Sequence, residues 1–394
     1  MVLVTLLAMG LSLSSSRRTS QRALHSTPNM PQTRDQLESR LRAALWSFFA
    51  GDALAAPTHW YYGGASEIRR DYGSIQGYTK PVYHLPGSIL NKSNLNGGGR
   101  SHGRSSSDHQ TIIGDVICHG KKDLWSPTQQ IHYHATLAKG ENTLEAQLAR
   151  VLMKSIVAND GTFDAHHFRQ AYIAFMTTPG SHNDTYASTC HRMFFENLVH
   201  RGLPPEDCAD NDYHNTDAVD GLVLPTIVAL AAKNSEQAAK DAQACSGVTR
   251  ASVKLDQASA EWGRLVYGAV RAEPSLLPDL LQNLASNLGL RRPSVRRQDE
   301  LTACYLASAL PALLDSILSH REESVWEGLL ANANTGGENV HRGSCLGAVL
   351  GSQHAFEELE SELSTGLHDS EQLKSEIDDF IKVVLRDDET PVVG

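Results

Sequence analysis

Apolar side chains recur at intervals of three and four residues along most of this chain, and the alternation of apolar and polar residues that marks a β-strand is almost absent. The stretch RDQLESRLRAALWSFFAGDALAAP shows the pattern, and ENTLEAQLARVLMKSIVA repeats it. Two further stretches, GLVLPTIVALAAK and YLASALPALLDSIL, are apolar on almost every side, as expected of helices at the centre of a core. The sequence therefore predicts an all-α, single-domain fold over residues 35–390, with acidic terminal helices at about 357–388.

The composition is that of an ordinary globular protein. Of the 394 residues, 41% are hydrophobic and 20% are charged, which is enough to bury a sizeable core. The net charge is −10 and the body contains no dense run of Lys or Arg, which argues against nucleic acid as a partner. No apolar run reaches the roughly 18 residues that a membrane span requires. The six cysteines include no C-x-x-C pair and are expected to be reduced thiols rather than zinc ligands.

The first 34 residues differ from the rest of the chain. They carry several Arg and many Ser and Thr, with no acidic residue before Asp35, which is the pattern of a mitochondrial transit peptide. The apolar run at 2–13 also suits a secretory signal, although no basic segment precedes it, and a disordered tail on a cytoplasmic protein is the third alternative. Residues 1–34 are therefore interpreted as a targeting or disordered segment, with mitochondrial localisation favoured.

Two regions of the body are expected to lack regular structure. Residues 61–107 are rich in Gly, Ser and Tyr, and so long a connection inside a compact domain indicates either function or disorder. Residues 233–250 are expected to form a surface connector. Functional residues are therefore sought where polar segments meet the ends of helices.

Polar residues gather at three such junctions. FAGDALAAPTHWYY carries Asp52 and, beyond Pro57, His59; SHGRSSSDHQTIIGDVI carries Asp108 and His109. The third junction, TGGENVHRGSCLGAVLGS, places a carboxylate, an amide, an imidazole and a guanidinium within five residues, which are Glu338, Asn339, His341 and Arg342. Helix N-termini supply free N–H groups and a field that favours anions, so each junction is a candidate ligand site.

Glycines follow the third junction at every fourth position. Gly343, Gly347 and Gly351 fall on one stripe of a helix, where the absence of side chains would let a second helix approach closely. This packing would also hold the preceding loop firmly against its neighbours.

The first and third junctions resemble the two end signatures of the ADP-ribosylglycohydrolase superfamily, which includes the J1 crystallins. The family patterns are G-D-A-x-G-x-P-x-E, then T-D-D-T, then G-G-D-T-D-T before a helix rich in Gly and Ala; this chain has GDALAAPTHW and TGGENVHRGSCLGAVLGS in the same order. The resemblance covers about 40–355 and implies an orthogonal all-α bundle around a pair of Mg²⁺ or Mn²⁺ ions. Those ions would hold the ribose of small-molecule or protein-linked ADP-ribose and position a water.

The chain departs from these signatures at several metal ligands. The Glu of the first signature becomes His59, and T-D-D-T falls best on SSDH at 106–109. In the last signature the two Asp positions become Glu338 and Val340, and the final Thr becomes His341. A valine cannot bind a metal, so at least two carboxylates of the dinuclear centre are missing.

Histidine has replaced the family residue three times, which changes the metal that the site would prefer. A mixed cluster of imidazoles and carboxylates suits Zn²⁺, Mn²⁺ or Fe²⁺ better than Mg²⁺. Its predicted members are Asp108, His109, His59, Glu338 and His341. Three alternatives follow: one metal in an altered site, a near-normal Mg²⁺ pair, or no metal at all. Glu338 and Asp108 are the catalytic candidates.

Further residues are assigned to substrate binding by the resemblance. In the family the middle of the chain lines the ADP-ribose cleft, which implies contacts from Asp184, His214 and Asp217, although capping of the following helix is the simpler interpretation of Asp184. From the last signature Gly336, Gly337, Asn339 and Arg342 are added. Lys139 and Arg342 are the candidates for a pyrophosphate contact, and Arg342 is favoured because its planar guanidinium suits bidentate binding.

Another pair of histidines, His132 and His134, has the H-x-H spacing that can chelate a metal. The pair lacks an obvious third ligand in the sequence, so a metal role there is weakly indicated.

Two functions of different kinds are compatible with this pattern. The first is a divergent hydrolase of an ADP-ribosyl or related ribosyl bond, in which a metal-assisted water attacks the anomeric carbon. The alternative is a non-catalytic ADP-ribose- or nucleotide-binding protein, or a crystallin-like structural protein, which the lost carboxylates favour. A different metal-dependent hydrolysis is a third reading of the histidine enrichment.

Overall fold

The computed structural model describes residues 32–97, 110–126, 128–295 and 304–386. Over these ranges the chain is all-α, as predicted, and isolated β-bridges such as His84–Ile131 stand in place of strands. The described residues from Thr33 onward form one compact unit. Within the described ranges, no helix has both the length and the apolar character needed to cross a membrane.

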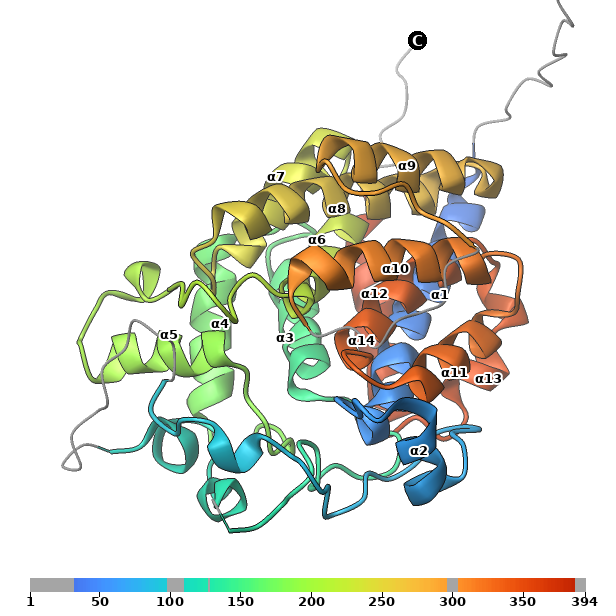
Figure 1. Cartoon of the computed structure of the whole chain (residues 1–394). Helices are drawn as coiled ribbons and strands as arrows, with labels where there is room; N and C mark the ends of the chain where they lie inside the picture. The colour runs from blue at the N-terminus through green and yellow to red at the C-terminus, as the bar shows by residue number, and fades with distance from the viewer. Residues whose placement is uncertain (1–31, 98–109, 127, 296–303, 387–394) are drawn as a thin grey trace, which may run out of the picture. The chain divides into compact units, whose positions relative to one another are not determined.

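The α-helices of the described residues are labelled in Figure 1. In chain order they are α1 (Arg34–Ala55), α2 (Gly64–Tyr72), α3 (Leu144–Ala158), α4 (Ala165–Thr177), α5 (Thr189–Val199), α6 (Val223–Ala231), α7 (Ser235–Ser246), α8 (Val253–Arg271), α9 (Leu277–Asn287), α10 (Leu306–His320), α11 (Val325–Thr335), α12 (Val340–Gly351), α13 (Glu360–Ser364) and α14 (Ser370–Val384). The acidic C-terminal stretch thus forms two helices, α13 and α14, as its pattern predicts.

Two sequence-based expectations are wrong in detail. The region 61–107 contains the helix α2, whose nine residues carry only one apolar position, Ile68, that is deeply buried. Most of residues 233–250 form the helix α7 instead of a surface connector. Helix α7 packs against both α6 and α8. Figure 1 shows α7, α8 and α9 together along one edge. In both segments the repeat of apolar residues is too short or too weak to predict a helix from the sequence alone. The helices form because neighbouring helices pack against their few apolar residues.

Helix α1 runs through the centre of the unit. Thr33 caps its start: the Thr33 hydroxyl accepts from the Gln36 N–H at 3.2 Å, and the Gln36 side chain accepts from the Thr33 N–H at 2.9 Å. Every residue from Ala43 to Ala55 is buried. Pro57 follows in a short 3₁₀ turn, Ala56–Thr58, which ends the helix and delivers His59 to the interior.

The glycine stripe on α12 packs directly against α1, as predicted. A methyl group added to Gly343 would lie 2.5 Å from the Gly51 carbonyl oxygen, and one added to Gly351 would lie 2.5 Å from the Ala43 carbonyl oxygen. Gly347 faces Ser47 in the same way. Backbone therefore meets backbone along the whole contact, which brings the loop before α12 next to the loop after α1.

Candidate functional site

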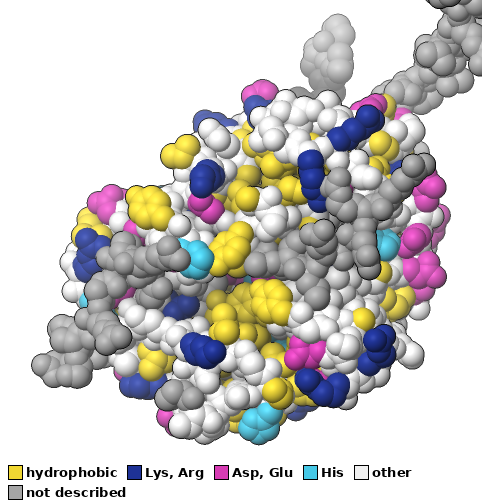
Figure 2. Space-filling model, viewed as in Figure 1, with side chains coloured by type: hydrophobic (Ala, Val, Ile, Leu, Met, Phe, Trp, Pro, Cys, Tyr) yellow, Lys and Arg dark blue, Asp and Glu magenta, His cyan; other side chains and the backbone are white. Residues whose placement is uncertain are grey.

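A cavity of about 370 Å³ lies where several loops meet the first turns of α5 and α12. Its lining mixes aromatic, cationic and acidic side chains, among them Trp60, Tyr62, Arg192, Asp220, Glu338 and His341. Figure 2 shows hydrophobic side chains gathered in the middle of the face that it displays. Of the large hydrophobic side chains that line this cavity, Tyr62, Ile89 and Tyr305 are 50%, 48% and 37% exposed, so the rim offers flat apolar surfaces.

The loop after α1 and the loop before α12 are hydrogen-bonded to each other. Gly336 and Gly337 both have positive φ, at 77° and 64°, and an added methyl on Gly336 would lie 2.5 Å from the Tyr61 carbonyl oxygen. The Trp60 N–H donates to Gly337 O at 2.7 Å, and the Gly337 N–H donates to Tyr61 O at 3.2 Å. The Gly-Gly pair is therefore required by this pairing, which aims Glu338 at His59.

Glu338 is the centre of a fully buried cluster. Its Oε2 lies 3.3 Å from His59 Nε2 and also accepts from the Trp60 indole N–H, while its Oε1 is bonded to His341 Nδ1. Glu338, His59 and His341 are 0%, 0% and 4% exposed. One ligand-type atom from each of the three lies within 4.8 Å of the others, so the trio could hold a metal ion.

Burial and mutual charge set the protonation of this trio. Burial opposes ionisation of Glu338, but the charges of His341 and His59 outweigh it and hold the Glu338 pKa well below its ordinary value. Burial likewise opposes the charged form of His341, but Glu338 raises the His341 pKa to about 9. For His59 burial wins, and its pKa falls to about 4. At neutral pH and without a metal, Glu338 is thus a carboxylate, His341 an imidazolium and His59 a neutral ring.

A hydrogen-bonded chain extends from His59 away from the cavity. His59 Nδ1 lies 2.7 Å from His134 Nε2, and His134 Nδ1 lies 2.8 Å from Asp184 Oδ1. Asp184 Oδ2 accepts from the N–H of Leu144, the first residue of α3, at 2.8 Å. Asp184 therefore caps α3, not the aromatic helix α5 that follows it in sequence, because the fold brings the start of α3 to its loop.

Two buried side-chain pairs lie at or near the cavity. Arg250 binds the cavity-lining Asp220 through two hydrogen bonds of 3.1 and 2.8 Å. His191 Nε2 lies 2.7 Å from Glu145 Oε1. Burial alone would raise the Glu145 pKa, but the His191 imidazole acts against burial and lowers it. Glu145, Cys190 and His191 also have metal-like spacing, but His191 Nδ1 is bonded to the Tyr172 hydroxyl at 2.8 Å, so both of its nitrogens are occupied.

Comparison with known proteins identifies the fold around this cavity. The sequence profile of the family described as ADP-ribosylglycohydrolase matches residues 33–390. The chain belongs to the ADP-ribosylglycohydrolase family. A solved structure described as an "ADP-ribosylglycohydrolase-related protein complex" is similar in fold, with a TM-score of 0.58 at 14% identity over 89% of this chain and 99% of that one. No protein with curated annotation matches. Family membership supports a hydrolase-like function and a divalent metal.

Only some of the family signature positions lie at this cavity in the described residues. Glu338 and His341 line the cavity, and His59 is buried directly beside them. Val340, in place of a family Asp, is fully buried in the apolar core and offers no ligand. Asp108 and His109 lie outside the described residues, so their part in the site stays a prediction.

Two residues expected to bind substrate face the protein interior instead of the cavity. Arg342 is 1% exposed; its Nε donates to Asn332 Oδ1 at 2.7 Å and its Nη2 donates to Gly336 O at 3.4 Å. Asn339 donates through its side-chain N–H to the Thr58 hydroxyl at 2.8 Å. Arg342 is not among the residues that line the cavity, and its guanidinium holds the Gly-Gly loop, so the pyrophosphate contact expected of it stays a prediction. Arg192, which the sequence did not single out for this role, is the buried arginine that lines the cavity.

His214 and Asp217 line a separate cavity of about 400 Å³, which borders the first through Tyr305. His214 Nε2 lies 3.0 Å from the Tyr305 hydroxyl, and Asp217 pairs with Lys254 at 3.3 Å. These two predicted residues are thus brought near the rim but not to the Glu338 cluster.

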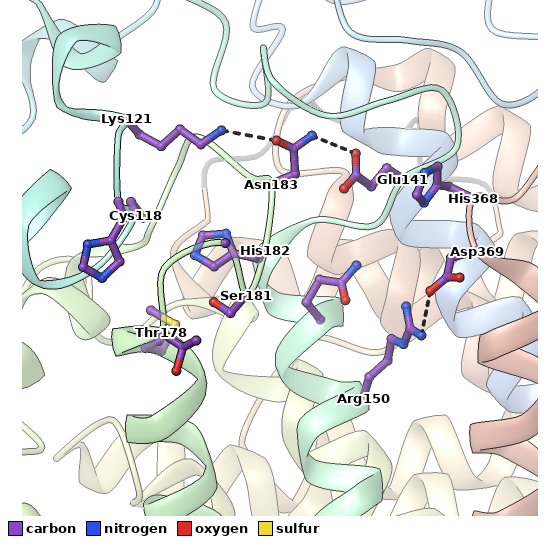
Figure 3. Close-up of a pocket in the computed structure, with 14 residues that line it drawn as sticks. Cys118, Lys121, Glu141, Arg150, Thr178, Ser181, His182, Asn183, His368 and Asp369 are labelled. Atoms are coloured by element: carbon purple, nitrogen blue, oxygen red, sulfur yellow. Dashed lines mark hydrogen bonds and ion pairs between the residues drawn. The ribbon is translucent and has the colours of Figure 1, made fainter.

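A third cavity, of about 370 Å³, is shown in Figure 3. Several of its polar side chains are bonded to one another: Lys121 donates to Asn183 Oδ1 at 3.3 Å, and Asn183 donates to Glu141 Oε2 at 3.2 Å. On another side Arg150 pairs with Asp369 at 3.0 Å. The groups neutralise each other, so this cavity has no net charge pattern that points to a ligand.

Proposed function

We propose that this protein is a divergent ADP-ribosylglycohydrolase that cleaves an ADP-ribosyl or related ribosyl bond in the Glu338 cavity with the help of a divalent cation. The observation that supports this most directly is the convergence of His59, Glu338 and His341, of which Glu338 and His341 line that cavity. Removing two imidazoles and a carboxylate from water costs considerable free energy, which a role in binding a cation would account for.

The donor set fits a cation of the Zn²⁺ or Mn²⁺ type. Two imidazole nitrogens and one carboxylate are the ligands that such ions take, whereas Mg²⁺ prefers oxygen alone. When bound, the ion would polarise a ribose hydroxyl or a water and lower its pKa. The proton on His341 would have to leave first, because a ligating imidazole is neutral.

The residues of this chain would divide the remaining work. Trp60 fixes the Glu338 carboxylate by donating its indole N–H to Oε2. Asp220, held by Arg250, adds a second carboxylate to the cavity wall, where negative charge stabilises an oxocarbenium-like centre. Tyr62 and Tyr305 at the rim offer faces on which a nucleobase can stack. Asp108 is proposed as a further acid or base.

The test is a cleavage assay on the full chain. An ADP-ribosylated protein and O-acetyl-ADP-ribose are incubated with Mg²⁺, Mn²⁺, Zn²⁺ or a chelator, and free ADP-ribose is measured. Glu338→Gln should abolish release, and Glu362→Gln, on the exposed surface of α13, should leave it unchanged. Absence of cleavage with every cation would refute the hydrolase proposal.

One observation favours the non-catalytic alternative. Glu338 is already bonded to His59, Trp60 and His341, so the cluster is electrostatically complete without a metal. A protein that only binds ADP-ribose, or serves a crystallin-like structural role, would bind the nucleotide or not at all, with no effect of chelator.

We also propose mitochondrial delivery by residues 1–34. A fusion of this segment to a fluorescent protein should be imported, and replacing its four Arg by Gln should prevent import. Cytoplasmic or secreted fluorescence from the unchanged segment would refute the proposal.

A further inference from the structure

Four buried groups from four separate segments form one continuous row. Asp184, His134, His59 and Glu338 are joined by contacts of 2.8, 2.7 and 3.3 Å, and none is more than 2% exposed. The two imidazole rings are nearly parallel, with 7° between their planes. Because water is excluded from the row, each contact must be satisfied by a proton or another positive charge within it.

The contacts of the row fix where each ring would carry its hydrogen if His59 Nε2 bound a cation. A ligating Nε2 carries no hydrogen, so His59 would donate from Nδ1 to His134 Nε2, which lies 2.7 Å away. His134 would then donate from Nδ1 to the Asp184 carboxylate, which only accepts. His59 Nε2 faces Glu338 Oε2 at 3.3 Å, the longest contact in the row.

We infer that Asp184 and His134 are positioning residues that hold His59 with its hydrogen on Nδ1, so that His59 Nε2 is presented to a divalent cation bound by Glu338. A cation held by His59 and Glu338 would add positive charge at this end of the row, and the contacts of His59 Nδ1 and His134 Nδ1 would stay hydrogen-bonded. Outer partners of this kind fix the tautomer and orientation of a ligating histidine. The inference rests on the proposed cation site.

The neighbouring His132 shows that this arrangement is specific to His134. His132 Nε2 donates to Pro57 O at 3.0 Å, and His132 Nδ1 accepts from the His134 backbone N–H at 3.0 Å. Both nitrogens are therefore used by the backbone, and the ring makes no side-chain bond to the row. The two histidines of the H-x-H pair thus have separate roles, one structural and one in positioning.

The row is also anchored at its far end. Asp184 Oδ2 accepts from the N–H of Leu144 at the start of α3, where the helix field favours a carboxylate. This leaves Asp184 Oδ1 for His134 and fixes its distance to the ring. Replacing Asp184 by Asn keeps the shape but removes the charge that selects the His134 tautomer.

The experiment measures cation affinity, not activity. Zn²⁺ and Co²⁺ affinities of the full chain are determined by competition with a chromophoric chelator for the wild type, His134→Phe, Asp184→Asn and the control His132→Gln. We expect the affinity to fall about 10–100-fold in His134→Phe and Asp184→Asn. In His132→Gln it should change less than about threefold, since an unperturbed cation site keeps its outer partners. Circular dichroism confirms folding, and Asp184→Asn serves if His134→Phe fails to fold.

A second readout tests the tautomer itself. In long-range ¹H–¹⁵N spectra of the Zn²⁺-loaded wild type, the His59 ring should carry its hydrogen on Nδ1, and Asp184→Asn should weaken this preference. Wild-type binding with unchanged affinity in both row variants would overturn the positioning role and leave the cation site intact. Absence of Zn²⁺ and Co²⁺ binding by the wild type would overturn both.

Discussion

His59 Nε2 lies 3.3 Å from Glu338 Oε2, although 279 positions separate the two residues along the chain. The contact joins the loop after α1 to the loop before α12, and the glycine stripe between these two helices holds them in register. The chemistry of the site and the packing of the core thus depend on the same interface, and each can be tested separately.

The Glu338–His341 pair should make stability depend on pH. The His341 pKa is raised from 6.5 to about 9 in the folded state, so its stabilising effect is fully present below pH 6.5 and is lost as pH rises through 9. Each pH unit between these values is worth about 1.4 kcal/mol, which gives about 3 kcal/mol. Urea unfolding in chelator should show wild type exceeding His341→Gln by about this much at pH 6 and by much less at pH 9.5 to 10. A pH-independent difference would contradict the assignment.

Gly351→Ala should destabilise the fold without touching the cavity. The new methyl would lie 2.5 Å from both Ala43 O and Ser47 Oγ, so α1 and α12 would have to separate. We expect the free energy of unfolding to fall by about 1–3 kcal/mol, as for other overpacked sites. The matched control is Gly247→Ala, whose methyl meets nothing closer than 3.5 Å; an equal loss there would show that helix approach is not the cause.

Removing Arg250 alone should destabilise the fold more than removing the charges of both Asp220 and Arg250. Arg250→Met leaves Asp220 without its partner at a position only 7% exposed, which should reduce stability by about 3–5 kcal/mol. The double variant Asp220→Asn, Arg250→Met should recover part of this loss, because no unpaired charge remains. Denaturant unfolding of these two variants and of the single variant Asp220→Asn gives the coupling energy, and additive losses would rule out a direct interaction.

Cys304 should report occupancy of the cavity. It is the cysteine of the described residues that is not fully buried, it lines the cavity, and burial raises its pKa well above the ordinary value. Alkylation by iodoacetamide should therefore be slow at pH 7.5, faster at pH 9.5, and slowed by ADP-ribose. Mass spectrometry locates the label, with Cys304→Ser as the control; labelling unaffected by ADP-ribose would place the nucleotide elsewhere.

The sequence alone determined the helical class, the helical character of the acidic C-terminal stretch and the close packing along Gly343, Gly347 and Gly351. These features depend on the order of neighbouring residues, since a helix repeats every 3.6 positions and a stripe is fixed by that repeat. The family resemblance added His59, Glu338 and His341 as a group, because the two end signatures carry them.

Only the tertiary structure decided which polar residues meet. Arg342 and His341 are adjacent in sequence, yet the first turns to Asn332 and the second to the cavity. His134 and Asp184 join His59 because the loops before α3 and α5 are brought against the end of α1. Hydrophobic burial selects the helix faces locally, but hydrogen-bond partners of buried polar groups come from whichever segments the packing brings within 3 Å, and no local pattern encodes that.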